Sequence, residues 1–271
     1  MDNAKEYYNK SSRDYADKWG FLEADLNKPA NFYRKIGIDL LIESAGVKNG
    51  DKVVEIGCGT GLVLRELLKK TSPVFGVDVS IEMLKRAQDS VLKDKRAVIL
   101  EDFSNLENRS EEVFLALDDF SDLHIVKNYF DKILSLEVFR YICDLDKALY
   151  NARNVMKENT IFVFTLTNFW SFSFFPIKYS FRKFIGLVNE RKELLQYFVT
   201  EKLIRKKLRE QGLEIVRFEK LNLLSLNPLV ARFVKNRKQA EMITRVDRRL
   251  SKTPFINKLF DTFLIAVRKV N

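Results

Sequence analysis

A short apolar strand that runs directly into a glycine-rich turn constrains this chain more than any other feature. Residues 53–61 read Val-Val-Glu-Ile-Gly-Cys-Gly-Thr-Gly, and a helical pattern of leucines begins at Leu62. Glycines at a strand-to-helix turn let the backbone approach a ligand closely, because no Cβ stands in the way. The free N–H groups at the start of the next helix attract an acidic group. The turn therefore predicts a ligand site at the end of a buried strand.

A carboxylate follows the next apolar strand. Residues 74–77 lead to Asp78, seventeen residues after Gly61, and a carboxylate in this place can accept hydrogen bonds from both hydroxyls of a ribose. The spacing differs from that of a dinucleotide site, whose third glycine would fall on Leu62. Glu55 would also repel a pyrophosphate, whereas it would attract an amino group or a sulfonium cation. Together these features predict a nucleoside-cofactor site.

The glycine turn with Glu55 resembles motif I of the class I S-adenosylmethionine-dependent methyltransferases, and four further segments match that family in order. They are similar to its second strand and helix, its acid near the adenine, its fourth strand and its last strand, at residues 77–87, 101–103, 130–138 and 263–269. The resemblance implies S-adenosylmethionine (SAM) as the cofactor, S-adenosylhomocysteine as its product and methyl transfer as the reaction.

The resemblance also implies roles for individual residues. The glycine turn and Glu55 would hold the methionine end of the cofactor, Asp78 would bind the ribose, and Met83, Asp102 and Phe103 would flank the adenine. The full set of cofactor residues that it implies is Tyr15, Glu55, Gly57, Cys58, Gly59, Thr60, Gly61, Asp78, Val79, Met83, Asp102, Phe103 and Leu136. For Tyr15 two interpretations are open: it approaches the methionine carboxylate, or it only holds an N-terminal helix against the core.

The segment after the fourth strand carries the candidate catalytic residues. Many relatives have a histidine there, but residues 138–142 read Val-Phe-Arg-Tyr-Ile. Glu137 and Tyr141 remain as candidate proton acceptors, although Glu137 could equally orient the cofactor or a loop. Arg140 could hold an acidic substrate or be a solvated residue at the start of a helix. The only histidine, His124, is expected to have a surface or packing role away from the chemistry, and no metal site is expected.

Strands alternate with helical segments along the chain. Strands are expected at residues 52–57, 74–78, 97–101, 130–136, 160–166, 213–219 and 262–268. Helices are expected at 31–45, 61–70, 81–92, 145–156 and around 203–208, with Gly212 ending the last one. This alternation predicts an α/β, Rossmann-like, doubly wound sheet of seven mostly parallel strands, and the family resemblance adds an antiparallel last strand. Within the long connection at 103–129, residues 111–120 are expected to form a short acidic helix.

The chain is expected to form one methyltransferase domain over residues 1–271. Its parts would be an N-terminal helical cap, a cofactor-binding core and two substrate-side or lid additions, at residues 1–45, 46–167, 168–200 and 221–261. Two cysteines without metal-ligand spacing suggest free thiols in a reducing cytoplasm. No apolar run approaches the roughly 20 residues that span a bilayer, and no apolar signal segment begins the chain.

Charge is distributed unevenly. Residues 1–170 carry a net charge of −4 and residues 171–271 a net charge of +14, and an aromatic–basic segment at 168–184 follows the fifth expected strand. Three interpretations of this segment are open: a helical lid, a pocket for an apolar or lipid-like substrate that carries an acidic group, with contact to an anionic membrane, or a nucleic-acid surface.

We expect a cytoplasmic or membrane-peripheral methyltransferase that acts on a small, apolar and anionic biosynthetic intermediate. One alternative is a methyltransferase recruited to nucleic acid or protein by the basic C-terminal surface. The other is a non-catalytic module that binds the cofactor, or nothing, and acts through that surface.

Overall fold

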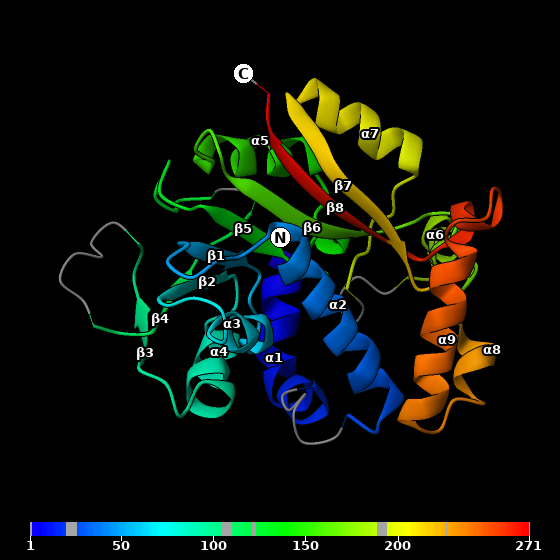
Figure 1. The fold of residues 1–271 in the computed structure, drawn as a ribbon, viewed down its shortest axis with the longest axis horizontal. Helices are drawn as coiled ribbons and strands as arrows, with labels where there is room; N and C mark the ends of the chain where they lie inside the picture. Colours follow the sequence, from blue (N-terminus) through cyan, green and yellow to red (C-terminus); the bar gives the residue numbers. More distant parts are fainter. Residues whose placement is uncertain are drawn as a thin grey trace.

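A mixed eight-stranded sheet crosses the molecule, and helices cover both of its faces (Figure 1). The computed structural model describes residues 2–19, 26–103, 110–120, 123–188, 194–225 and 227–270; within the first helix it describes the side chains of residues 4–12. The strands in chain order are β1 (Val53–Ile56), β2 (Val74–Asp78), β3 (Ala97–Leu100), β4 (Val113–Leu117), β5 (Lys132–Ser135), β6 (Ile161–Thr167), β7 (Leu213–Leu221) and β8 (Thr262–Lys269).

The spatial order of the strands is β3-β4-β2-β1-β5-β6-β8-β7. All neighbouring pairs from β3 to β6 are parallel, and β8 runs antiparallel to both β6 and β7. The predicted Rossmann-like, mostly parallel sheet with an antiparallel last strand is therefore confirmed, with eight strands in place of seven.

The additional strand is β4, and the helix expected at residues 111–120 was wrong. Residues Val113 to Ala116 are buried between β3 and β2. A parallel strand that is buried on both faces has a continuous apolar sequence. Such a sequence lacks the alternation of apolar and polar residues that distinguishes a strand from a helix. The five-residue length of the run Val-Phe-Leu-Ala-Leu was the better guide, because helices are commonly longer.

The helices agree with the other expectations. They are α1 (Asp2–Trp19), α2 (Pro29–Ala45), α3 (Leu62–Leu67), α4 (Ile81–Arg86), α5 (Leu145–Val155), α6 (Phe175–Phe184), α7 (Glu201–Glu210), α8 (Pro228–Ala231) and α9 (Arg237–Leu250), with a π-helical turn η1 (Ala87–Val91) and 3-10 turns η2 (Phe139–Tyr141) and η3 (Ile256–Leu259). Gly212 follows α7 with φ +63°, the left-handed conformation expected after a helix. None of the helices in the described part of the chain combines the length and apolar character needed to cross a bilayer.

Successive side chains of the strands supply two separate cores. Val53 packs with α2, α3 and α4 on one face of the sheet, whereas its neighbour Val54 packs with α5 and α7 on the other. The second core is rich in phenylalanine, with Phe75 stacked on Phe114 at 5.2 Å between ring centroids. Because β1 and β2 are buried on both faces, their carboxyl ends are held rigidly where the site lies.

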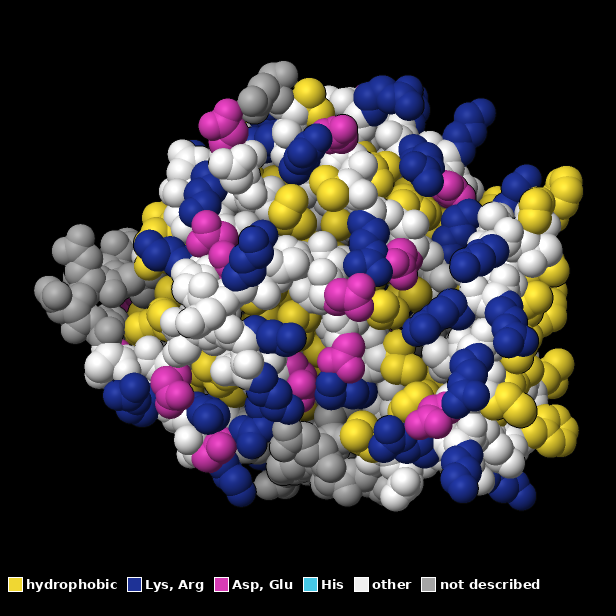
Figure 2. Space-filling view, viewed as in Figure 1, with side chains coloured by type: hydrophobic (Ala, Val, Ile, Leu, Met, Phe, Trp, Pro, Cys, Tyr) yellow, Lys and Arg dark blue, Asp and Glu magenta, His cyan; other side chains and the backbone are white. Residues whose placement is uncertain are grey.

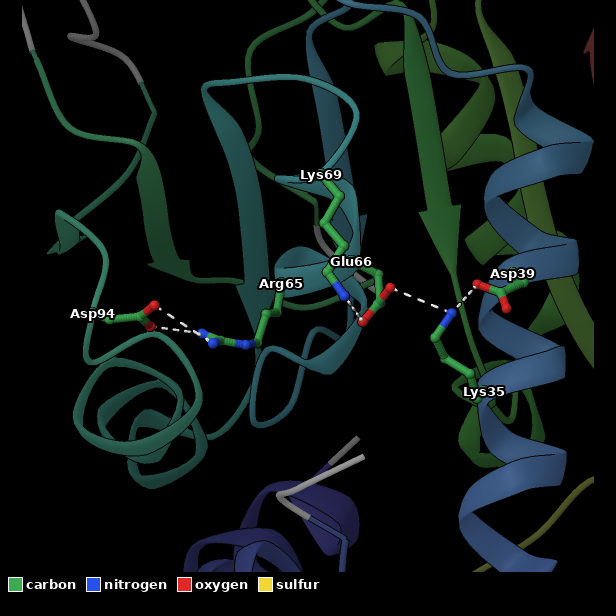
Figure 3. A network of polar contacts seen from close by, with 6 residues as sticks. All are labelled: Lys35, Asp39, Arg65, Glu66, Lys69 and Asp94. Atoms are coloured by element: carbon green, nitrogen blue, oxygen red, sulfur yellow. Dashed lines mark hydrogen bonds and ion pairs between the residues drawn. The ribbon is translucent and has the colours of Figure 1, made fainter. Parts of the chain in front are cut away.

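A polar network fastens the helices on the first face (Figure 3). Glu66 of α3 is buried and forms ion pairs with Lys35 of α2 at 3.4 Å and with Lys69 at 2.8 Å. Arg65 reaches Asp94, after η1, at 2.6 Å. These contacts hold α3, which begins at the glycine turn, in a fixed position against its neighbours.

Candidate active site

A cavity of about 270 Å³, called here the first cavity, lies beyond the carboxyl ends of β1, β2, β4 and β5, where ligands bind in open α/β sheets. Helix α1 covers it, because Ser80 Oγ donates to Asn9 Oδ1 at 2.7 Å and Ala4 and Tyr8 line the cavity. The other lining residues are Arg34, Ile56, Gly57, Gly59, Asp78, Val79, Met83, Asp118, Phe120, Leu136, Glu137, Val138 and Tyr141.

The glycine turn has the backbone that its sequence predicts. Gly57, Gly59 and Gly61 have φ angles of +78°, +52° and +81°, a region that other residues rarely adopt. A Cβ on Gly57 would lie 2.2 Å from Val138 Cγ2, so this glycine is also required by packing. A Cβ on Gly59 would meet no atom within 4 Å. The turn therefore leaves open space at Gly59, where a ligand can approach the backbone.

Asp78 connects β2 to this turn. Its carboxylate is buried and accepts hydrogen bonds from the backbone N–H groups of Gly59 at 2.8 Å and Ser80 at 2.9 Å. Burial raises the pKa of Asp78 to about 6, although these hydrogen bonds act in the opposite direction. The position is favourable for binding the hydroxyls of a ribose.

Glu55 is a buried carboxylate that forms no ion pair with any of the described residues. It is only 2% exposed, and its Oε2 makes no hydrogen bond in the described structure. Burial, followed by the charge of Asp78, raises the pKa of Glu55 well above its ordinary value. An amino group or a sulfonium bound beside the turn would offset the free-energy cost of ionising this buried carboxyl group. The turn and the two carboxylates thus fit S-adenosylmethionine.

A second cavity of about 500 Å³ continues from the first. The two share five lining residues, which are Arg34, Gly57, Gly59, Leu136 and Glu137. The second cavity also contains Glu55, Cys58 and Thr60 from the turn, and extends to the residues that surround α6 and α8. Its lining there includes Arg140, Thr165, Ser173, Phe175, Leu221, Asn222, Pro228, Asp261 and Thr262.

Glu137 and Arg140 form an ion pair in the wall of the second cavity, with Nη2 and Oε2 3.3 Å apart. Glu137 has φ +60°, an uncommon conformation for a residue other than glycine, held by its N–H donating to Thr165 Oγ1 at 2.7 Å. The Arg140 side chain is 20% exposed, and its buried Nε has no partner among the described residues. Burial lowers the pKa of Arg140, but Glu137, Tyr141 and Asp261 outweigh it and raise the pKa. Arg140 is not a solvated helix-start residue.

The structure brings most of the predicted site residues together. The two cavities are lined by Glu55, Gly57, Cys58, Gly59, Thr60, Asp78, Val79, Met83, Leu136, Glu137, Arg140 and Tyr141. Gly61 begins α3, and Asp102 and Phe103 line neither of these two cavities. Phe103 is instead 2% exposed and packs edge-on against Phe75 in the core. The side chain of Tyr15 lies outside the described residues.

Asp118 is the main site residue that the sequence reasoning missed. It directly follows β4, much as Asp78 ends β2. Its carboxylate accepts hydrogen bonds from the N–H groups of Asp119 at 2.8 Å and His124 at 2.9 Å. Burial raises its pKa, partly opposed by these hydrogen bonds. The sequence contained the same signal, an apolar strand that ends in a carboxylate. It was not recognised because residues 111–120 were expected to form a helix. His124 is therefore nearer to the site than expected, although its side chain is 69% exposed.

Comparison with known proteins agrees with this geometry. The family described as "Methyltransferase domain" matches residues 47–212. An uncharacterized protein of Methanocaldococcus jannaschii is 30% identical over 208 residues, which are 76% of this chain and 69% of that protein. The malonyl-[acyl-carrier protein] O-methyltransferase of Geobacter sulfurreducens is 23% identical over 191 residues, which are 69% of this chain but 65% of the enzyme.

A solved structure shares the fold over almost its whole length. The magnesium protoporphyrin IX methyltransferase of Synechocystis PCC 6803, with bound S-adenosylhomocysteine, has a TM-score of 0.62 at 14% identity, and the match covers 98% of each chain. The present chain belongs to the class I S-adenosylmethionine-dependent methyltransferases. S-adenosylmethionine is the cofactor of that family.

Proposed function

We propose that this protein transfers a methyl group from S-adenosylmethionine to a small, apolar and anionic acceptor held in the second cavity. The cofactor would supply an electrophilic methyl group. The chain's own residues would then bind the acceptor in line with that group and exclude water. The observation that carries the proposal is the buried Nε of Arg140 in the cavity wall, which finds no partner in the described structure.

In the first cavity, we assign Asp78 to the ribose hydroxyls and Glu55 to the cationic methionine end. Met83 would pack on the adenine, and Asp118 with Phe120 would take the place that the sequence resemblance gave to Asp102 and Phe103. Two observations support this assignment: Asp118 lines the same cavity as Asp78, and the backbone N–H of Asp118 donates to the backbone carbonyl of Asp78 at 3.1 Å, which holds the two strand ends together.

On the acceptor side, Arg140 supplies a positive charge in a cavity wall that also contains Thr165 and Asp261. Its ion-pair partner Glu137 is 53% exposed, so a better-buried carboxylate or phosphate on the acceptor could compete for the guanidinium. Ile38, Phe175 and Pro228 line the remainder of the cavity and suit an apolar body.

An acceptor that is already ionised needs no general base. This agrees with the absence of a histidine at residues 138–142. Glu137 would then position Arg140, and Tyr141, which lines the first cavity, would contact the cofactor or remove a proton from a less acidic acceptor. Two of the similar proteins are named for acceptors that carry carboxylates, since both a malonyl group and a protoporphyrin do so.

A lipid-like acceptor would be found in or beside a membrane. The protein would then work at the cytoplasmic surface of that membrane. Both cysteines are free, Cys58 being buried and Cys143 exposed, as is usual in a reducing compartment.

The test is transfer of a radiolabelled methyl group from S-adenosylmethionine to matched pairs of acceptors, such as a long-chain fatty acid and the corresponding alcohol. We expect the acid to be methylated and the alcohol not. Arg140→Leu should raise KM for the acid at least about tenfold, the loss of one charged hydrogen bond, with cofactor affinity unchanged and partial rescue by Arg140→Lys. The exposed Arg209→Leu is the matched control. Equal methylation of acid and alcohol would contradict the proposal.

A further inference from the structure

One end of the molecule exposes apolar side chains among basic ones. Figure 2 shows hydrophobic side chains protruding along the edge formed by α6, α8 and α9, interleaved with lysines and arginines. We call the exposed side chains of three segments, residues 171–188, 222–225 with 227–240, and 248–260, the docking face. These three segments contain eleven lysines and arginines and no aspartate or glutamate.

Helix α6 displays an amphipathic pattern with its apolar side facing outward. Pro176 and Tyr179 are buried, whereas Ile177, Phe181 and Phe184 are exposed, the two phenylalanines by 63% and 88%. The exposed three have i, i+4, i+7 spacing and so lie on one face of the helix. Lys178 and Lys183 are also exposed on this helix. A helix of this kind lies in the interface of a membrane, with its apolar side toward the acyl chains.

The other two segments present the same chemistry. Leu229 and Phe233, in and after α8, are 66% and 77% exposed, and Phe255 before η3 is 77% exposed. Arg232 and Lys258 are exposed close to them in the chain. Large apolar side chains exposed together in this number indicate a contact surface and not ordinary surface variation.

Hydrogen bonds tie the three segments together where they leave the sheet. Asn227 Nδ2 donates to Phe172 O at 3.3 Å, Phe172 N donates to Leu259 O at 2.8 Å, and Asn168 Nδ2 donates to Lys258 O at 2.8 Å. The exposed apolar side chains of the docking face therefore extend from a common base, which consists of these hydrogen-bonded residues. The second cavity reaches this base, because Ser173 and Pro228 are among its lining residues.

We infer that the docking face binds the surface of an anionic phospholipid membrane. The basic residues of the docking face match an anionic surface, although one of them, Arg237, is paired with Glu241 of α9 at 2.9 Å. The exposed phenylalanine rings would enter the headgroup region. Nucleic acid fits less well, since Ile177 and Leu229 have no ring on which a base can stack. An amphiphilic acceptor could then pass from the membrane to the second cavity along the base of α6 and α8.

The test is cosedimentation of the full chain with vesicles of phosphatidylcholine, with and without phosphatidylglycerol. We expect binding to the mixed vesicles at least about tenfold tighter than to the neutral ones, since each basic residue near the surface contributes about 1 kcal/mol. The double variant Phe181→Ser with Phe184→Ser should lose most of this binding. Lys178→Glu with Lys183→Glu should lose the preference for phosphatidylglycerol.

Matched controls lie on α5 and α7. Tyr150→Ser with Leu203→Ser removes exposed apolar groups, and Lys202→Glu with Lys206→Glu reverses exposed charges; both should bind as the wild type does. Absence of binding to mixed vesicles, or unchanged binding by the phenylalanine variant, would overturn the inference, as would binding of a single-stranded oligonucleotide through these phenylalanines in place of vesicles. The measurement needs neither cofactor nor acceptor, so its failure would leave the proposed methyl transfer standing.

Discussion

Glu55 and Asp78 face the same glycine turn from adjacent parallel strands, and burial, followed by the charge of Asp78, raises the pKa of Glu55. Both carboxylates are buried, and Glu55 Oε2 has no partner in the described structure. Burying two acids side by side costs stability in the absence of a ligand. Such an arrangement is common where a ligand supplies the missing partners, here a cation and a pair of hydroxyl groups.

Cofactor affinity should depend on pH through Asp78. Its pKa of about 6 in the folded protein means that the carboxyl group is protonated below that pH and then donates where it should accept. Affinity for S-adenosylmethionine should therefore fall as the pH is lowered through about 6 and be level above about 7. Calorimetric titrations from pH 5 to 8 measure this. A constant affinity over the whole range would show that Asp78 does not bind the ribose as an anion.

Glu55→Gln should stabilise the cofactor-free protein and weaken cofactor binding. The folded pKa of Glu55 is raised, so the native state holds this proton more tightly, and ionisation of Glu55 costs stability as the pH rises above the ordinary value of 4.5. At pH 8 the variant should unfold about 2–4 °C higher, the shift for about 1 kcal/mol in a domain of this size. Thermal unfolding with and without S-adenosylmethionine checks both effects. A lower midpoint in the cofactor-free variant would contradict this account of Glu55.

Asp118 and Asp102 should differ in their effect on the cofactor. Asp118→Ala should lower the affinity for S-adenosylmethionine by about 1.5–3 kcal/mol, as expected for one charge-assisted hydrogen bond. Asp102→Ala is the matched control, because Asp102 follows the neighbouring strand β3 but does not line the first cavity. It should leave the affinity within about twofold. A loss of affinity in Asp102→Ala and none in Asp118→Ala would contradict this assignment and support the role that the sequence resemblance implied for Asp102.

Two glycines of the turn should respond differently to alanine. Gly57→Ala should destabilise the fold by about 1–3 kcal/mol, the range for overpacking, because its Cβ would clash with Val138 Cγ2, and Val138→Ala should recover part of the loss. A Cβ at Gly59 meets no protein atom within 4 Å, so Gly59→Ala should lose less stability than Gly57→Ala. Its loss should come only from the strain of a side chain at φ +52°, and cofactor binding should also fall. Denaturant unfolding and calorimetry separate the two effects. Equal losses of stability would contradict an open cradle at Gly59.

The sequence predicted the parts of the fold in which local pattern and burial agree. The run from Val53 to Gly61 and the strand ending at Asp78 each combine a strand, a turn and a polar end, so several signals indicate the same structure. For β4 the local signals disagreed, because its Leu and Ala residues have a high helix propensity. Its place between β3 and β2 depends on pairing with residues distant in the chain, and a local pattern contains no such information.

The acceptor side was predicted less well for a different reason. The sequence indicated the aromatic residues at 168–184, but it could not show that Tyr179 is buried while Phe181 is exposed. That difference depends on which side of α6 packs against residues 194–198, where Tyr179 contacts Leu194 and Phe198. Likewise, the role proposed for Arg140 rests on its burial and its pairing with Glu137, and both depend on tertiary packing.

Calorimetric titration of the purified chain with S-adenosylmethionine and S-adenosylhomocysteine tests the central claim most directly. The account predicts binding of both, with an affinity for S-adenosylmethionine that falls at least about tenfold in Asp78→Ala, since each lost charge-assisted hydrogen bond costs about 1.5–3 kcal/mol. A folded wild-type protein that binds neither compound, or an Asp78→Ala variant that binds as tightly as the wild type, would contradict it.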